Sequence, residues 1–276
     1  MTPPASLTIG GSASPVSTPQ RFRPNLALRT AMPWAIFLDL YRVLADPGVM
    51  EQNYRRRYAE IFNRDFDVPI AKGKQIHDET YAWYTAEGAR LDSLQGDMRD
   101  GDEWIRAVYR MEADHLRMAF ELAGLPPPPN LNSYWMKLEA EICSGIDALY
   151  SDVKPALAEL KADGHRIFLS TNATQSNGEF ALVGGGIKEM FDGLVFMENA
   201  KGKKDRHHYW RRAFTVTKVK PAEAAVVDDI PAYLAPVSGM GARCFQMIRP
   251  EHSNLKKGQW PIIVSLAELP AALRKP

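Results

Sequence analysis

Three aspartates stand directly after short apolar runs, at positions where a carboxylate can do chemistry. Asp39 follows the run from residue 34 to 38, and Asp228 and Asp229 follow the run from residue 224 to 227. Each run is too short for a typical helix and suits a strand that is buried on both faces. Because open α/β sheets bind ligands at the carboxyl ends of their strands, Asp39 is either a strand-end cap or the centre of an active site, and the later acidic pair favours the active site.

A hydroxyl, an amide and a lysine occur between the first aspartate and the acidic pair. Thr171 and Asn172 follow another short apolar run, and Lys203 lies in the basic, glycine-broken stretch AKGKKD. The alternative for Lys203 is a solvated loop lysine beside Lys201 and Lys204, but its spacing from the acidic pair favours the site. Together these groups suit an oxyanion beside a divalent cation, because carboxylate oxygens are good ligands for hard cations.

In this order the groups resemble the four motifs of the haloacid dehalogenase-like hydrolase superfamily. The likeness extends from residue 32 to the C-terminus, through the segments YSDVKPALAELKADGHRIFLSTN and IKEMFDGLVFMENAKGKKD. The stretches DLYRVLA, the Thr-Asn pair and DDIPAYLAPVSGMGA are most similar to the phosphatase domain of soluble epoxide hydrolases. The resemblance implies an α/β fold, with a Rossmann-like parallel sheet, helices on both faces and a small α-helical cap domain.

For a phosphorylated substrate, the resemblance implies a covalent intermediate on Asp39. A carboxylate held at attack distance can split one difficult displacement into two easier ones. Mg²⁺ would be bound by Asp39, both carboxylates of the acidic pair and the backbone carbonyl of Tyr41. Thr171, Asn172 and Lys203 would hold the transferring oxygens, and Lys203 would also position Asp39.

Tyr41 departs from the pattern of the superfamily's phosphatases, which carry a second aspartate at this position as the general acid. A tyrosine with a pKa near ~10 is poorly matched to that task, and general acid–base help is worth roughly 10²–10⁴-fold. Arg42 also replaces the usual glycine. We therefore expect a substrate whose leaving group needs little protonation, such as an acyl or aryl phosphate.

The dehalogenases of the superfamily have an Asp-x-Tyr first motif, as this chain does. They use no metal, because halide leaves without a proton, but they lack the acidic pair and need an arginine from the cap. Candidates near that place do not clearly meet the requirement: Lys72, Lys74, Gln75 and Arg90. The acidic pair outweighs Tyr41, because two buried carboxylates without a cation would be costly.

Four hypotheses for function follow. The leading one is an Mg²⁺-dependent hydrolase acting on a small phosphorylated metabolite, and the second is a metal-independent 2-haloacid dehalogenase. The third is a degenerate member that binds a phosphorylated ligand or a protein partner without turnover. A phosphonate-cleaving enzyme with a Schiff base on Lys72 or Lys74 is the fourth.

Helical patterns fill the interval between the first predicted strand and the second motif. Apolar residues recur at helical spacing over residues 50–62 and 135–149, and further helices are predicted over 74–90 and 102–123. Such an insertion is what the resemblance describes as a type 1 cap, which excludes water and supplies specificity. The predicted domains are a disordered leader over residues 1–31, a Rossmann-like core over residues 32–48 and 150–276, and a cap over residues 49–149.

Five aromatic residues of the predicted cap have two interpretations. Most are expected to pack in the core of the cap, and one or two to face Asp39 and line a pocket for a partly apolar substrate. The five are Tyr81, Trp83, Tyr84, Trp104 and Tyr134.

Beyond residue 152 the chain alternates between helical and strand patterns, which predicts a parallel sheet joined by right-handed crossovers. Strands are expected at 167–169, 194–196, 224–227 and 243–247, with a closing helix at 265–273.

The composition, with 45% hydrophobic and 24% charged residues, is ordinary for a globular protein. A net charge of +1 gives no support to nucleic acid or an anionic membrane as partner, so we expect a small-molecule substrate. Cys143 and Cys244 are too few for a disulfide framework, and no apolar run approaches the ~20 residues that cross a bilayer, so a cytoplasmic location is expected. Residues 1–31 contain no acidic residue and predict disorder or a start codon placed before Met32, with a transit peptide as the alternative.

Overall fold

The computed structural model describes residues 33–94 and 101–275 of the chain. The predicted leader, residues 1–31, lies outside the described residues. None of the helices in these two ranges combines the length and the apolarity that crossing a membrane requires.

The described residues form a sheet of six parallel strands in the order β3-β2-β1-β4-β5-β6. Its central strand, β1, is buried along its whole length, as its apolar sequence predicts. The five predicted strand positions are confirmed, and the two-residue β6 was not predicted because so short a segment has no periodic pattern. The strands are Ala35–Leu38 (β1), Arg166–Ser170 (β2), Gly193–Val195 (β3), Ala224–Asp228 (β4), Arg243–Met247 (β5) and Ile262–Ile263 (β6).

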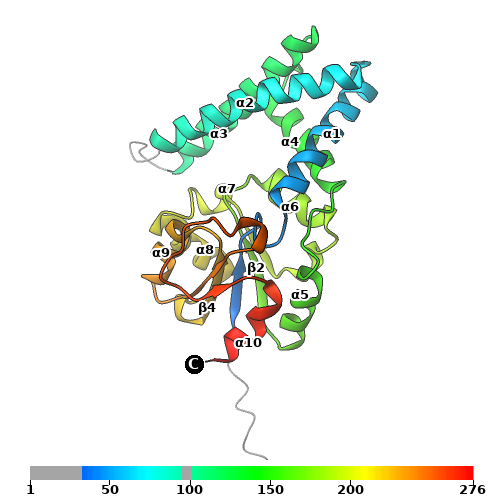
Figure 1. The fold of residues 1–276 in the computed structure, drawn as a ribbon. Coiled ribbons are helices and arrows are strands. Elements are labelled where there is room, and N and C mark those ends of the chain that lie inside the picture. The colour runs from blue at the N-terminus through cyan, green and yellow to red at the C-terminus, as the bar shows by residue number, and fades with distance from the viewer. Residues whose placement is uncertain (1–32, 95–100, 276) are drawn as a thin grey trace, which may run out of the picture. The chain divides into compact units, whose positions relative to one another are not determined.

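Helices cover both faces of this sheet (Figure 1). Successive side chains of β1 enter different hydrophobic clusters, because neighbours along a strand point to opposite faces. Ile36 packs with residues of α5 and α10, whereas Phe37 packs with residues of α8 and α9. The predicted α/β fold is therefore confirmed. These flanking helices are Val153–Ala162 (α5), Gln175–Gly184 (α6), Met197–Ala200 (α7), His207–Thr217 (α8), Pro231–Ser238 (α9) and Leu269–Arg274 (α10).

Short 3₁₀ turns join several of these elements. They are Lys188–Met190 (η2), Pro221–Glu223 (η3), Pro250–His252 (η4) and Leu266–Glu268 (η5). The predicted closing helix over 265–273 is thus a 3₁₀ turn followed by α10.

Four longer helices are inserted between β1 and β2. They are Pro47–Phe66 (α1), Ile70–Leu94 (α2), Gly101–Ala123 (α3) and Leu131–Ser144 (α4). The side chain of Asp46 accepts hydrogen bonds from the amides of Gly48 and Val49 and so caps α1, and Pro47 begins it where no backbone donor is needed. Helices α2 and α3 lie side by side (Figure 1). All four predicted helices are present, and α1 and α2 are longer at both ends than their patterns indicated. Helix α4 begins before the predicted range and ends at Ser144 rather than at residue 149.

Candidate active site

The carboxyl ends of β1, β2 and β4 meet at one edge of the sheet, because the three strands are parallel and in register. Leu38, the last residue of β1, lies opposite Leu169 and Val227. The amide of Asp39 donates a hydrogen bond to the carbonyl of Val227 across 3.0 Å, which carries the pairing one residue further. The side chains that follow these strands are therefore brought to one place.

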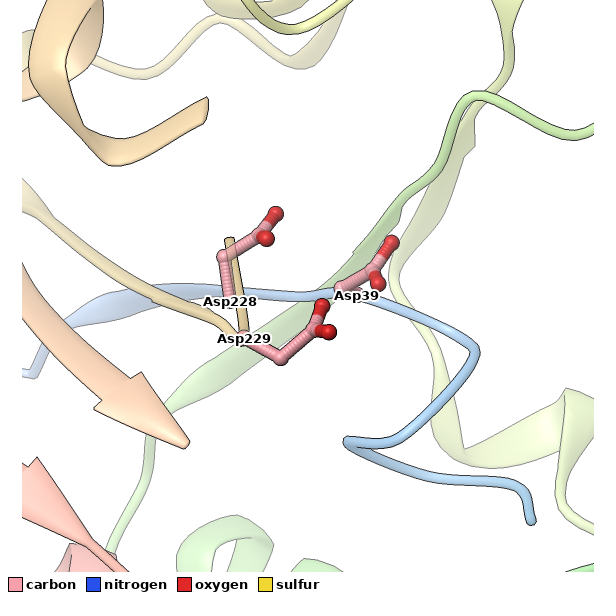
Figure 2. A group of neighbouring side chains, drawn as sticks. All are labelled: Asp39, Asp228 and Asp229. Atoms are coloured by element: carbon pink, nitrogen blue, oxygen red, sulfur yellow. The ribbon is translucent and has the colours of Figure 1, made fainter. Parts of the chain in front are cut away.

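Three predicted site residues, Asp39, Asp228 and Asp229, form one buried cluster (Figure 2). One oxygen of each carboxyl lies within 4.8 Å of the others. Asp39 leaves the end of β1, and the acidic pair leaves the end of β4. This geometry agrees with the prediction that the three carboxylates lie together.

The lysine in this cluster is Lys204, and the prediction of Lys203 was wrong. The Lys204 ammonium contacts Asp39 and lies 2.7 Å from Asp228 Oδ2, and its side chain is 1% exposed. Lys203 instead forms an ion pair with Asp92 of α2, at 2.5 Å between Nζ and Oδ2. The two neighbouring side chains thus point in different directions, and Lys204 is the one that enters the cluster.

Backbone contacts hold Lys204 in this orientation. The Lys204 amide donates to Asn172 Oδ1 across 2.9 Å, and its carbonyl accepts from Trp210 Nε1 across 2.9 Å. Lys201 adopts a left-handed backbone conformation with φ of 54°, which turns the loop just before the lysine pair. Asn172, predicted to bind substrate, thus also positions the site lysine.

The charges of the cluster are only partly balanced. Burial raises the pKa of the Asp228 carboxyl to about 7, although Lys204 beside it acts in the opposite direction. Burial raises the pKa of Asp39 as well. Burial alone would lower the pKa of the Lys204 amine, but the charges of Asp228 and Asp39 outweigh it and raise that pKa, so Lys204 stays protonated.

Arg42 supplies a second cation to the cluster. Its Nη1 lies 3.1 Å from Asp229 Oδ2, and its side chain is 38% exposed. Arg42 has a φ of 63°, a conformation that glycine adopts more readily. The three carboxylates face two cationic side chains, which leaves one negative charge without a partner when all are ionised. The donor set fits a divalent cation, and Arg42 would compete with such a cation for the charge of Asp229.

The Tyr41 hydroxyl forms a hydrogen bond to α6. It donates to Asn177 Oδ1 across 2.6 Å. Burial, together with the nearby Cys143 and Glu139, raises the pKa of the Tyr41 hydroxyl well above its usual range. The hydroxyl therefore stays protonated at neutral pH and is poorly matched to acid–base catalysis, which agrees with the expectation from its residue type.

Thr171 stands at the end of β2 beside β1, where it was predicted. Its hydroxyl accepts a hydrogen bond from the amide of Ala173 across 3.1 Å, so it stabilises the turn after β2. The buried hydroxyl of Ser170 has no hydrogen-bond partner among the described residues. Arg90, one candidate for halide binding, is paired with Glu87 across 2.7 Å on the surface of α2.

Two adjoining cavities lie beside this site. The smaller has a volume of about 280 Å³ and the larger about 510 Å³. Of the five aromatic residues of the predicted cap, Tyr81 and Tyr84 line the smaller cavity, and Tyr84 and Trp104 line the larger. The sequence analysis missed Asn177 and Glu139, which line both cavities and contact Tyr41 or its partner, since no motif marks them.

Residues 109–235 match the family described as haloacid dehalogenase-like hydrolase. Over this stretch the chain is similar to haloacid dehalogenase-like hydrolases. The predicted resemblance to this superfamily is therefore confirmed. The more specific resemblance to the phosphatase domain of soluble epoxide hydrolases stays a prediction.

A 132-residue stretch of the chain is 27% identical to Enolase-phosphatase E1 of Acidiphilium cryptum (strain JF-5). The match covers 46% of this chain and 56% of that protein, so the chain spans little more than half the length of this relative.

Two solved structures share the fold of this chain at low sequence identity. L-2-haloacid dehalogenase from Xanthobacter autotrophicus, with chloropropionic acid covalently bound, has a TM-score of 0.56 at 16% identity over 88% of this chain and 99% of that one. The putative HAD-hydrolase YfnB from Bacillus subtilis, bound to magnesium, has a TM-score of 0.56 at 13% identity over the same shares. Both likenesses support the fold.

Proposed function

We propose that the chain hydrolyses a small phosphorylated molecule through a covalent intermediate on Asp39, with Mg²⁺ as cofactor. The cluster of three buried carboxylates carries this proposal, because buried carboxylates persist only with cationic or hydrogen-bonding partners. The similarity to a protein named as a phosphatase and to a fold neighbour bound to magnesium supports it. Helices α1–α4 would act as the cap, over residues 49–149, and residues 32–48 with 150–276 as the core.

The chain's own residues can carry out both displacements. Asp39 would attack phosphorus, so that an Oδ–P bond forms while the bond to the leaving oxygen breaks, and water would then cleave the aspartyl-phosphate to phosphate and free carboxylate. Lys204 would hold the Asp39 carboxylate in position and offset negative charge on the substrate. Mg²⁺ bound by the three carboxylates would neutralise charge on the transferring oxygens.

The leaving group must depart without help from Tyr41. Its hydroxyl is committed to Asn177, and its raised pKa removes it from acid–base exchange near neutrality. We therefore propose that good substrates are acyl or aryl phosphates rather than alkyl phosphates.

Metal-independent dehalogenation of a 2-haloacid is the second candidate. The ion pair between Arg42 and Asp229 favours this candidate, because the guanidinium supplies a cation to the two adjacent aspartates without a metal. Tyr41 agrees with it as well, since halide departs without a proton. Asp39 would then displace halide from carbon and form an ester that water cleaves.

Turnover of an aryl phosphate and of 2-chloropropionate, each with Mg²⁺ and with chelator, separates the candidates. Asp39→Asn serves as the matched control, because amide and carboxylate have nearly the same shape. Phosphate release that needs Mg²⁺ and is lost in the variant supports the phosphatase, and chloride release with chelator present supports the dehalogenase. Tight binding of phosphorylated ligands without turnover of either substrate would point to a binding module.

A further inference from the structure

The smaller cavity adjoins the active-site end of the larger one. Four residues line both cavities: Tyr41, Tyr84, Glu139 and Asn177. The larger cavity also reaches Tyr233, and Lys204 Nζ lies 5.1 Å from the centre of that ring. A ligand that occupies both cavities would thus extend from the sheet edge into the helical insertion.

Aromatic rings in contact form a wall of the smaller cavity, which we call the aromatic belt. The Tyr84 and His115 ring centres are 5.1 Å apart, those of His115 and Trp135 are 5.2 Å apart, and those of Tyr81 and Tyr84 are 6.2 Å apart. Burial lowers the pKa of His115 to about 3, so its ring is neutral at physiological pH. The belt consists of Tyr54, His77, Tyr81, Tyr84, His115 and Trp135.

Two buried glutamates beside this belt have no basic partner among the described residues. Glu139 lines both cavities and accepts hydrogen bonds from Ser176, from Thr174 across 2.9 Å and from Asn177 across 3.2 Å. Glu112 lines the larger cavity and accepts from Tyr84 across 2.8 Å, while its second oxygen has no hydrogen-bond partner among the described residues.

The walls of the two cavities contain little positive charge. None of the described residues that line the smaller cavity is a lysine or an arginine, and the larger has only Lys203, which is paired with Asp92. Burial raises the pKa of both glutamates, and no neighbouring cation opposes it. A bound cation would favour the ionised form of these glutamates, because it supplies the charge that a buried carboxylate otherwise lacks.

We propose that the aromatic belt and the two glutamates bind an alkylammonium group, so that the substrate carries a cationic amine at the end remote from Asp39. The faces of aromatic rings attract cations, most strongly where both are shielded from water. A methylated ammonium also fits apolar walls, since its methyl groups need no hydrogen-bond acceptors. The assignment of the remote end as part of a substrate rests on the proposed function.

Calorimetric titration of the full chain with choline and with 3,3-dimethylbutan-1-ol tests this proposal without any variant. The two probes have nearly the same shape, and only choline is charged. We expect choline to bind at least tenfold more tightly than the neutral alcohol. Equal affinities, or no choline binding at millimolar concentration, would overturn the proposal and leave an apolar cavity.

Glu139→Gln should lower the affinity for choline about tenfold and leave that for the alcohol unchanged. A glutamine retains hydrogen bonds to Ser176 and Thr174, and Glu112→Gln provides an independent variant. Glu141→Gln on the same helix is the matched control, because Glu141 is exposed and paired with Arg64. Loss of affinity for both probes in equal measure would contradict a charge effect.

The failure of this proposal is distinguishable from the failure of the proposed function. Choline binding with no turnover of an aryl phosphate or of 2-chloropropionate would retain the cation site and reject the hydrolase. Turnover of one of these substrates, with equal affinities for choline and the neutral alcohol, would support the hydrolase and reject the cation site. If both hold, an aryl phosphate that carries a trimethylammoniomethyl group should exceed its neopentyl analogue in kcat/KM, and Glu139→Gln should remove that preference.

Discussion

The sheet edge and the cavity of the helical insertion both bury several carboxylates, but they balance the charge differently. At the sheet edge, Lys204 contacts Asp39 and Asp228, and Arg42 contacts Asp229. In the cavity, Glu112 and Glu139 receive hydrogen bonds only from neutral groups. The sheet edge supplies most of its own cations, so it can bind an anionic group with at most one additional metal ion. The cavity lacks such cations, so it is suited to a cationic ligand.

Asp39→Asn should have the largest effect on activity and little effect on folding. Replacing a nucleophile removes the covalent step, and we expect turnover of the preferred substrate to fall by at least ~10³-fold. The variant should be as stable as the wild type or more so, because Asp228 and Asp229 lose a like charge nearby. Steady-state kinetics and urea unfolding measure the two properties, and turnover within tenfold of the wild type would exclude Asp39 as the nucleophile.

Lys204→Met should lower the free energy of unfolding by about 3 kcal/mol, because it leaves buried carboxylates without their shared cation. The matched control is Lys203→Met, which breaks an ion pair with the half-exposed Asp92 and should cost less than about 1 kcal/mol. Urea unfolding of both variants gives the comparison. Equal losses for the two lysines would contradict the assignment of Lys204 to the cluster.

Glu112→Gln should change how stability depends on pH. Burial, and then the charge of Glu139, raise the folded-state pKa of Glu112. The folded state therefore holds the proton more tightly than the unfolded state, and wild-type stability is lost as pH rises from about 4.3 through the raised pKa.

The Glu112→Gln variant keeps a neutral side chain at every pH and should lack this loss. Its unfolding free energy relative to the wild type should rise by about 1 kcal/mol or more between pH 5 and pH 8. The difference between the two proteins isolates Glu112 from the buried histidines, which titrate in both. A difference that does not vary with pH would show that Glu112 is not held in its protonated form.

Arg42→Gly should have the smallest effect on stability and should sharpen the comparison at the sheet edge. Glycine relieves the left-handed conformation, and the lost ion pair is partly exposed, so the unfolding free energy should change by less than about 1 kcal/mol. Asp229 is freed, and the apparent affinity for Mg²⁺ should increase severalfold in a titration of activity or of intrinsic fluorescence. Unchanged Mg²⁺ affinity would show that Arg42 does not compete with the metal.

The strands and the three aspartates could be predicted from the sequence because each depends on a short local pattern. An apolar run such as 224–227 is buried on both faces, and the residue after it must emerge at the edge of the sheet. Parallel pairing then brings Asp39 and the acidic pair together. The expectation that Tyr41 is a poor general acid also came from the sequence, because it depends on residue type.

The sequence could not show which of the two adjacent lysines enters the carboxylate cluster. Lys203 and Lys204 have the same chemistry and nearly the same spacing from Asp228, and the turn at Lys201 decides which of them enters the cluster. The pairing of Arg42 with Asp229 depends likewise on contacts between residues 187 positions apart.

The sequence by itself determined the parallel sheet, the helical insertion and the carboxylates at the strand ends, since local hydrophobic patterns and residue chemistry specify them. Only the tertiary structure decided which cationic side chain contacts which carboxylate. It also decided that Glu112 and Glu139 have no cationic partner among the described residues. The physical reason is that charge pairing inside a protein depends on side-chain direction and on distances of a few ångströms, which are set by contacts between distant parts of the chain.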